Sequence, residues 1–112
     1  MHELSICHAI TGICERHAAG RPVARVCVDI GELRQVVPLT LTSCWEIAVR
    51  DTALAGAVLD VNHIPAAIDC HACGHRTVLE HPVFRCARCG GTDTSVAGGD
   101  ELLITSLVLQ EA

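Results

Sequence analysis

The chain has 112 residues, a mass of 11.9 kDa and a formal net charge of −5, and all eight of its basic residues are arginines. A chain of this size forms one small domain, with or without a smaller added module, and its charge excludes the basic surface of a nucleic-acid or membrane binder. No apolar run reaches the roughly 18 residues of a membrane span, and the start, Met1-His2-Glu3-Leu4, is unlike a signal peptide. We therefore expect a cytoplasmic protein, in which the cysteines stay reduced.

The first predicted element is an amphipathic helix over about residues 3–19. Its apolar residues recur at intervals of three and four positions, and Gly20 with Pro22 marks its end. These apolar positions are Leu4, Cys7, Ile10, Cys14 and Ala18. A half-buried strand follows over residues 24–30, because apolar and polar residues alternate there up to Gly31.

A second helix is predicted to open at Pro38 and to be broken by Gly56. Its apolar face carries Leu41, Cys44, Trp45 and Ala48. Residues 57–64 read as a second strand and residues 101–109 as a third. The apolar phase of the third strand slips between Ile104 and Leu107, which indicates a bulge or burial on both faces.

Between the second and third strands the apolar periodicity disappears and Cys, His and Gly become frequent. The third strand must return to the sheet after this segment, so the segment is an insertion. We therefore predict an α+β fold in which two helices lie on a three-stranded sheet, with an inserted four-cysteine zinc-ribbon module. The expected domains are residues 1–66 plus 99–112 and, inserted between them, residues 67–98.

The inserted module contains two Cys-X-X-Cys pairs, Cys70 with Cys73 and Cys86 with Cys89. Two thiolates two residues apart on a tight turn can both reach one ion at about 2.3 Å, and four of them suit a closed, structural Zn(II) site. Iron in a rubredoxin-like centre would use the same ligands. The nearby histidines could compete as ligands, donate hydrogen bonds to the ligands, or simply be solvated; they are His71, His75 and His81.

The N-terminus is the second place where the sequence suggests metal chemistry. The amine of Met1, the amide and ring nitrogens of His2, and the amide or carboxylate of Glu3 can converge on one ion. Such nitrogen-rich coordination favours Ni(II) or Cu(II). The alternative interpretation is an exposed His2 with Glu3 at the start of a helix, where a negative charge is favourable.

Three segments together resemble the HypA/HybF family of hydrogenase maturation proteins. They are the opening Met1-His2-Glu3-Leu4-Ser5-Ile6, the paired Cys-X-X-Cys module closed by Gly98-Gly99-Asp100-Glu101-Leu102, and Val28-Asp29-Ile30-Gly31-Glu32-Leu33. The resemblance runs along the whole chain in the same order of elements. It implies a nickel metallochaperone that delivers Ni(II) as cargo to the large subunit of [NiFe]-hydrogenase with a HypB-type GTPase as partner, and in some members serves urease maturation proteins.

The resemblance implies a nickel site at Met1, His2 and Glu3 and a zinc site at the four cysteines of the module. One departure is His63, where relatives tend to carry an acidic residue. A zinc-ribbon adaptor between proteins, without a second metal, is the alternative function. No enzymatic activity is expected, because a four-thiolate site leaves no open position for hydrolysis and its thiolates are not free to exchange.

Four cysteines remain outside the zinc module. Cys7, Cys14 and Cys44 are predicted to be small core residues of the two helices. Cys27 lies on the polar side of the first strand, and we expect it to be exposed and open to oxidation.

Overall fold

The computed structural model describes residues 3–111, which form two compact units. Unit 1 contains the described residues up to Val28, Val36–Asn62 and the residues from Leu103 on, and unit 2 contains Asp29–Gln35 and His63–Leu102. The elements in chain order are α1 (Glu3–Ala18), β1 (Val23–Gly31), a 3-10 turn η1 (Glu32–Arg34), α2 (Pro38–Ala48), β2 (Val58–Ile64), β3 (Ala67–Cys70), β4 (Arg76–Val78), β5 (Thr94–Gly98) and β6 (Leu102–Leu109). No helix among the described residues is both long and apolar enough to cross a membrane.

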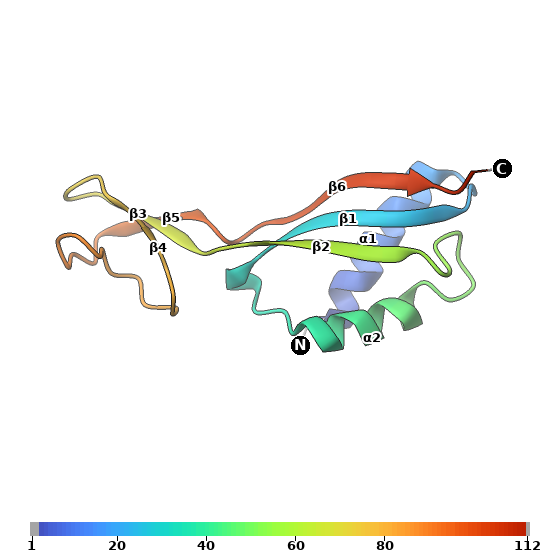
Figure 1. The fold of residues 1–112 in the computed structure, drawn as a ribbon, viewed down its shortest axis with the longest axis horizontal. Coiled ribbons are helices and arrows are strands. Elements are labelled where there is room, and N and C mark those ends of the chain that lie inside the picture. Colours follow the sequence, from blue (N-terminus) through green and yellow to red (C-terminus); the bar gives the residue numbers. More distant parts are fainter. Residues whose placement is uncertain (1–2, 112) are drawn as a thin grey trace. The chain divides into compact units, whose positions relative to one another are not determined.

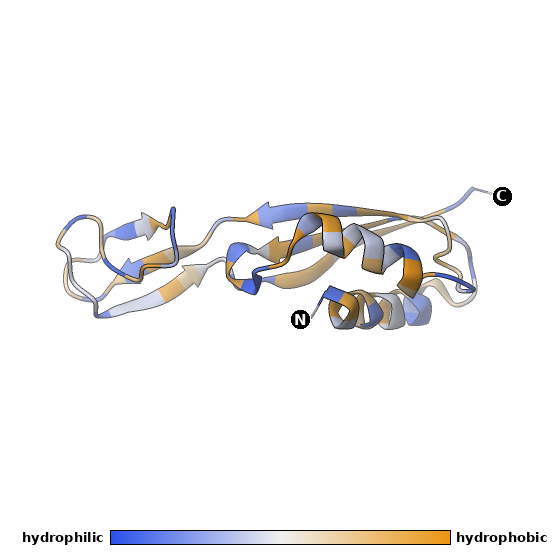
Figure 2. Cartoon of the chain, turned by 90° about the horizontal axis from the view of Figure 1, so that it is seen from below, coloured by the Kyte–Doolittle hydropathy of each residue, from blue (hydrophilic) through white to orange (hydrophobic). Residues whose placement is uncertain are grey.

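The predicted α+β fold is confirmed. Strands β2, β1 and β6 form a three-stranded sheet in that order, and both helices lie on the same side of it (Figure 1). Apolar segments recur along α1 and α2 (Figure 2), and their buried side chains form the core of unit 1 with those of β1. These buried residues include Cys7, Ile10 and Cys14 of α1, Leu41 and Trp45 of α2, and Val23, Val26 and Val28 of β1.

Helix α2 is shorter than the sequence predicted, because it ends at Ala48 and not near Gly56. Asp51 adopts a left-handed conformation with φ of 60°. The Thr52 hydroxyl donates to the carbonyl of Val49 at 2.7 Å and accepts from the amide of Leu54 at 3.1 Å. These local bonds replace helical ones, which explains why residues 49–57 form successive turns.

Trp45 of α2 holds the end of the turns over residues 49–57, just before β2 begins. Its side chain is 4% exposed, and its indole Nε1–H donates to the carbonyl of Ala57 at 2.9 Å. The bond satisfies the one polar atom of a large buried ring.

The core prediction for the cysteines holds for Cys7 and Cys14, which are 0% and 2% exposed. It is only partly correct for Cys44, which is half-buried. Cys27 is also half-buried and less exposed than predicted. In β6, burial changes phase between Ile104 and Leu107.

The second sheet, with the order β4-β3-β5, lies in unit 2 and was not predicted from the sequence. Its strands pair antiparallel and are only three to five residues long, too short to show a hydrophobic period. Ile68 at its centre is 1% exposed. Three other apolar side chains of the module are exposed, Val78 at 61%, Val83 at 60% and Phe84 at 44%.

Outside this sheet, two backbone segments of unit 2 approach each other closely. The amide of Gly31 donates to the carbonyl of Glu101 at 2.8 Å, and the amide of Leu33 donates to the carbonyl of Gly99 at 2.7 Å. A Cβ built on Gly31 would lie 2.0 Å from the carbonyl carbon of Gly99, and one on Gly99 would lie 2.5 Å from the Cα of Ala66. Only glycine fits at either position.

Candidate metal centre

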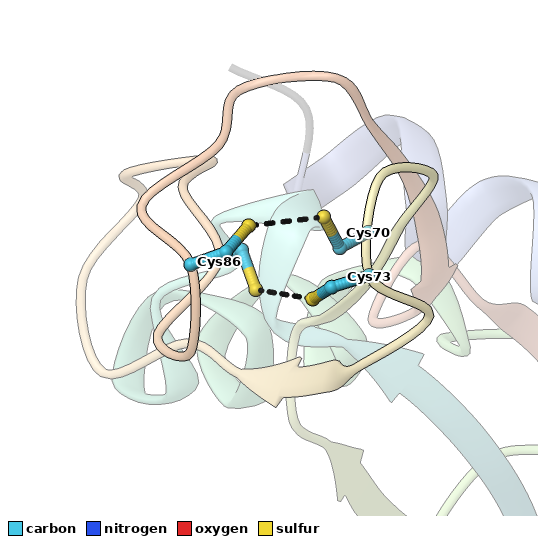
Figure 3. Close-up of side chains that lie close together, drawn as sticks. Cys70, Cys73 and Cys86 are labelled. Atoms are coloured by element: carbon cyan, nitrogen blue, oxygen red, sulfur yellow. Dashed lines mark hydrogen bonds between the residues drawn. The ribbon is translucent and has the colours of Figure 1, made fainter.

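Unit 2 brings the four cysteines of the module together. Their sulfur atoms all lie within 4.8 Å of one another, and they are the one group of three or more potential ligands found among the described residues. Cys70 Sγ is 3.6 Å from Cys89 Sγ, and Cys73 Sγ is 3.6 Å from Cys86 Sγ (Figure 3). A tetrahedral ion with metal–sulfur bonds of about 2.3 Å requires sulfur–sulfur edges of about 3.8 Å, so the site fits such an ion.

Two equivalent turns position these sulfur atoms. The amide of Gly74 donates to the carbonyl of Cys70 at 2.9 Å, and the amide of Gly90 donates to the carbonyl of Cys86 at the same distance. Gly74 and Gly90 adopt positive φ values of 77° and 74°, which glycine accepts without steric cost. Each turn therefore presents its two thiols on one side, and the two turns face each other.

Backbone amides favour thiolates at one cysteine of each turn. The amides of Cys89 and then Arg88 lower the pKa of Cys86 to about 6, and the amides of Cys73 and Ala72 lower the pKa of Cys70. The largest influence on Cys89 is the amide of Gly91, which lowers its pKa, but the surrounding cysteines and burial together raise that pKa to about 11. The site is thus built to hold negative charge that a bound cation would neutralise.

The surroundings of the turns contain contacts that the sequence did not reveal. His71 Nδ1 lies 3.1 Å from a carboxylate oxygen of Asp93, and its Nε2 lies 3.0 Å from the hydroxyl of Ser95. The Thr77 hydroxyl accepts from the amide of Ala87 at 3.0 Å. Through these contacts each turn is bonded to a strand of the second sheet. No local sequence pattern predicts pairs so far apart in the chain.

Among the other histidines considered as ligands, His75 is half-buried and His81 is exposed. The backbone carbonyl of His75 accepts from the amide of Cys70 at 3.0 Å. His63 is exposed on β2. None of them belongs to the ligand group that the described residues form.

Of the predicted nickel ligands, Met1 and His2 lie outside the described residues. Glu3 is the first residue of α1. Its carboxylate oxygen Oε2 accepts from the amide of Val37, the residue before α2, at 3.1 Å. The contact fixes the start of α1 against the start of α2.

Comparison with known proteins gives one family for nearly the whole chain. Residues 1–109 match the family described as "Hydrogenase/urease nickel incorporation, metallochaperone, hypA". The match includes both the N-terminal residues and the four-cysteine turns.

Individual relatives agree with the family match. The chain is 36% identical to the hydrogenase maturation factor HypA of Geobacter metallireducens, over 98% of this chain and 100% of that protein. It is also 36% identical to the HypA of a Nostoc species, over 99% of this chain and 97% of that protein.

Solved structures show the same fold. The solution structure of the Ni metallochaperone HypA from Helicobacter pylori superposes with a TM-score of 0.69 and 24% identity, covering 97% of each chain. A second solution structure of a HypA protein gives a TM-score of 0.71, also at 24% identity, over 98% of this chain and 97% of that one.

Proposed function

The chain belongs to the HypA family of nickel-incorporation metallochaperones, and from this premise we propose that it binds Ni(II) at its N-terminus and delivers it for assembly of the [NiFe]-hydrogenase active site. The observation that carries the proposal is the family match over residues 1–109, because it includes the residues Met1, His2 and Glu3. Their nitrogen donors suit a tetragonal ion such as Ni(II).

The position of Glu3 supports one mode of binding over the other. One oxygen of its carboxylate accepts from the amide of Val37 and so holds the side chain toward the α1–α2 junction. We therefore propose that Glu3 contributes its backbone amide to nickel and that its carboxylate orients the first turn of α1. A terminal chelate of this kind can be displaced ligand by ligand, which a carrier needs in order to release its cargo.

The four cysteines are proposed to hold one structural Zn(II). Four thiolates in a tetrahedron complete the coordination of zinc and leave no position for a reacting water. The exposed apolar side chains of the module, Val78, Val83 and Phe84, contribute little to a core, so the metal would supply much of the stability of this segment. The role of the ion is then to keep the two turns and the second sheet folded.

The partners proposed for delivery are a HypB-type nickel-binding GTPase and the large subunit of [NiFe]-hydrogenase. The family description also names urease, so urease maturation proteins are a second class of client to be tested. The proposed delivery of Ni(II) requires no reaction on this chain other than exchange of the ligands bound to the ion.

The decisive experiment is calorimetric nickel titration of the untagged protein beside a variant with two residues added before Met1. We expect tight binding at one equivalent for the native terminus, and loss of that binding in the extended protein and in His2→Ala. His8→Ala is the matched control, because His8 is an exposed histidine of α1 that takes no part in the proposed chelate. Affinity should fall as pH drops from about 8 to 6, since the terminal amine and the imidazole must both lose protons.

Equal nickel binding by the native and extended proteins would refute the terminal site. Absence of nickel binding by both, with one zinc retained per chain in elemental analysis, would favour the zinc-ribbon adaptor. One iron per chain would replace zinc in the proposal for the four cysteines and leave the nickel site untouched.

A further inference from the structure

Cys7 of α1 contacts α2 about one helical turn before Cys44. The Cys7 thiol on α1 is 0% exposed and donates to the carbonyl of Leu41 on α2, with a sulfur–oxygen distance of 3.7 Å. Cys44 is three residues beyond Leu41 on the same helix. A side chain three positions along a helix can reach that same carbonyl oxygen, as Ser and Thr side chains do. The Cys44 thiol is therefore within reach of the carbonyl that the Cys7 thiol contacts.

The electrostatic surroundings of Cys7 agree with a thiol nearby on α2. Burial raises the pKa of Cys7 to about 11, and the next largest causes are the charges of Cys44 and Glu3. Cys44 thus acts on Cys7 through space, across the helix contact. Neither cysteine belongs to the proposed metal sites.

We propose that Cys7 and Cys44 form a reversible intramolecular disulfide that ties α1 to α2 under oxidising conditions. This inference goes beyond the proposed metal delivery and does not depend on nickel binding. In a reducing compartment, a disulfide of this kind would be transient, as redox-sensing disulfides are.

The exposures of the two residues assign their roles. Cys44 is half-buried and can be reached by a small oxidant such as hydrogen peroxide, whereas the fully buried Cys7 cannot. The Cys44 sulfur attacks one peroxide oxygen and breaks the O–O bond, which gives a sulfenic acid and water. The Cys7 sulfur then attacks the sulfenic sulfur, its proton leaves with the departing hydroxide as a second water, and the S–S bond forms. Two thiols lose two electrons in total and one peroxide gains them.

The other two cysteines outside the metal centre lie elsewhere in the fold. Cys14 lies on α1 two turns beyond Cys7, about 10 Å along the helix axis, and is 2% exposed. Cys27 is on strand β1. The reaction should therefore be specific for one pair among the four cysteines outside the metal centre.

The test treats the full chain, with its metal bound, with one equivalent of hydrogen peroxide. The remaining free thiols are then alkylated in acid, and the peptides are analysed by mass spectrometry without reduction. Trypsin cleavage at Arg16, Arg34 and Arg50 places Cys7 and Cys44 in separate peptides, residues 1–16 and 35–50. We expect these two peptides to be joined, with a loss of two hydrogens that dithiothreitol reverses. Metal content measured in parallel separates this reaction from oxidation of the four-cysteine site.

Three variants make the assignment specific. Cys44→Ala should abolish the joined peptide, and it should fold because Cys44 is only half-buried. Cys7→Ser should abolish it as well. Cys14→Ala is the matched control, because it removes the other cysteine of peptide 1–16 and should leave the cross-link intact.

Closing a loop with 36 residues between the two cysteines should also raise the midpoint of thermal unfolding of unit 1 by about 10 °C relative to the reduced protein. The proposal is overturned if Cys44 accumulates as sulfinic acid, if Cys14 or Cys27 takes part in the bond, or if a covalent dimer forms in place of the intramolecular link. A failed nickel titration would not affect any of these readouts, so the two proposals fail separately.

Discussion

The close backbone approach in unit 2 allows a quantitative test with three single substitutions to alanine. Gly99 has a φ of 101° and no room for a Cβ, which would lie 2.5 Å from the Cα of Ala66. The left-handed backbone costs a non-glycine residue about 1–2 kcal/mol, and forcing an extra atom into a packed site costs about 1–3 kcal/mol more. We therefore expect Gly99→Ala to lower the free energy of unfolding by about 3–4 kcal/mol.

Two other glycines of unit 2 separate these contributions. Gly31 has an ordinary φ of −78°, but its Cβ would lie 2.0 Å from the Gly99 carbonyl, so Gly31→Ala carries the steric cost alone. Gly74 has a φ of 77° and nothing within 4 Å of its Cβ position, so Gly74→Ala carries the conformational cost alone, about 1–2 kcal/mol. The loss for Gly99→Ala should exceed that for Gly74→Ala by about 2 kcal/mol.

The assay is urea unfolding of the metal-loaded proteins followed by far-ultraviolet circular dichroism. Hydrogen exchange at the amides of Gly31 and Leu33, which bond across the approach, locates the damage. If Gly99→Ala and Gly74→Ala lose equal stability, or if Gly31→Ala is neutral, the backbones do not approach as described.

Three further predictions concern the metal centre. Cys86→Ala should lose the metal and leave residues 67–98 open to proteolysis, whereas Cys27→Ala should keep both; a protease-resistant segment without metal would contradict this. The pKa of Cys86 in the folded chain without metal is lowered from 9.0 to about 6, so its stabilisation is complete above pH 9 and is lost as pH falls through 6; metal affinity measured by competition with a chelator should weaken over that range, because protons compete for the thiolates. His71→Ala removes the contacts with Asp93 and Ser95 and should cost less than about 1 kcal/mol, because these side chains are exposed; the metal content should stay at one ion per chain while the rate of release to the chelator rises.

The parts of this fold with a strong hydrophobic period could be predicted from the sequence. Helix α1 and strand β1 were placed to within about one residue at each end. The clustering of Cys70, Cys73, Cys86 and Cys89 was also predicted, because Cys-X-X-Cys turns carry their geometry in four residues. Both kinds of signal are local.

The errors arose where side chains compete with secondary structure or where pairing is not local. The end of α2 was misplaced because the Thr52 hydroxyl bonds to the backbone within residues 49–54. The second sheet was missed because its strands are very short. The bond between Glu3 and the amide of Val37 joins residues 34 positions apart, and no local pattern predicts such a pair.

The anchoring of Trp45 also gives this protein an intrinsic optical probe. The chain has one tryptophan and no tyrosine, so its emission comes from a single indole, and that indole is bonded to the Ala57 carbonyl in unit 1. A shift of the emission to longer wavelength would mean that this ring has left its hydrogen bond and met water. Fluorescence therefore follows the helical unit of the unlabelled protein, while metal-thiolate absorption follows the cysteine turns.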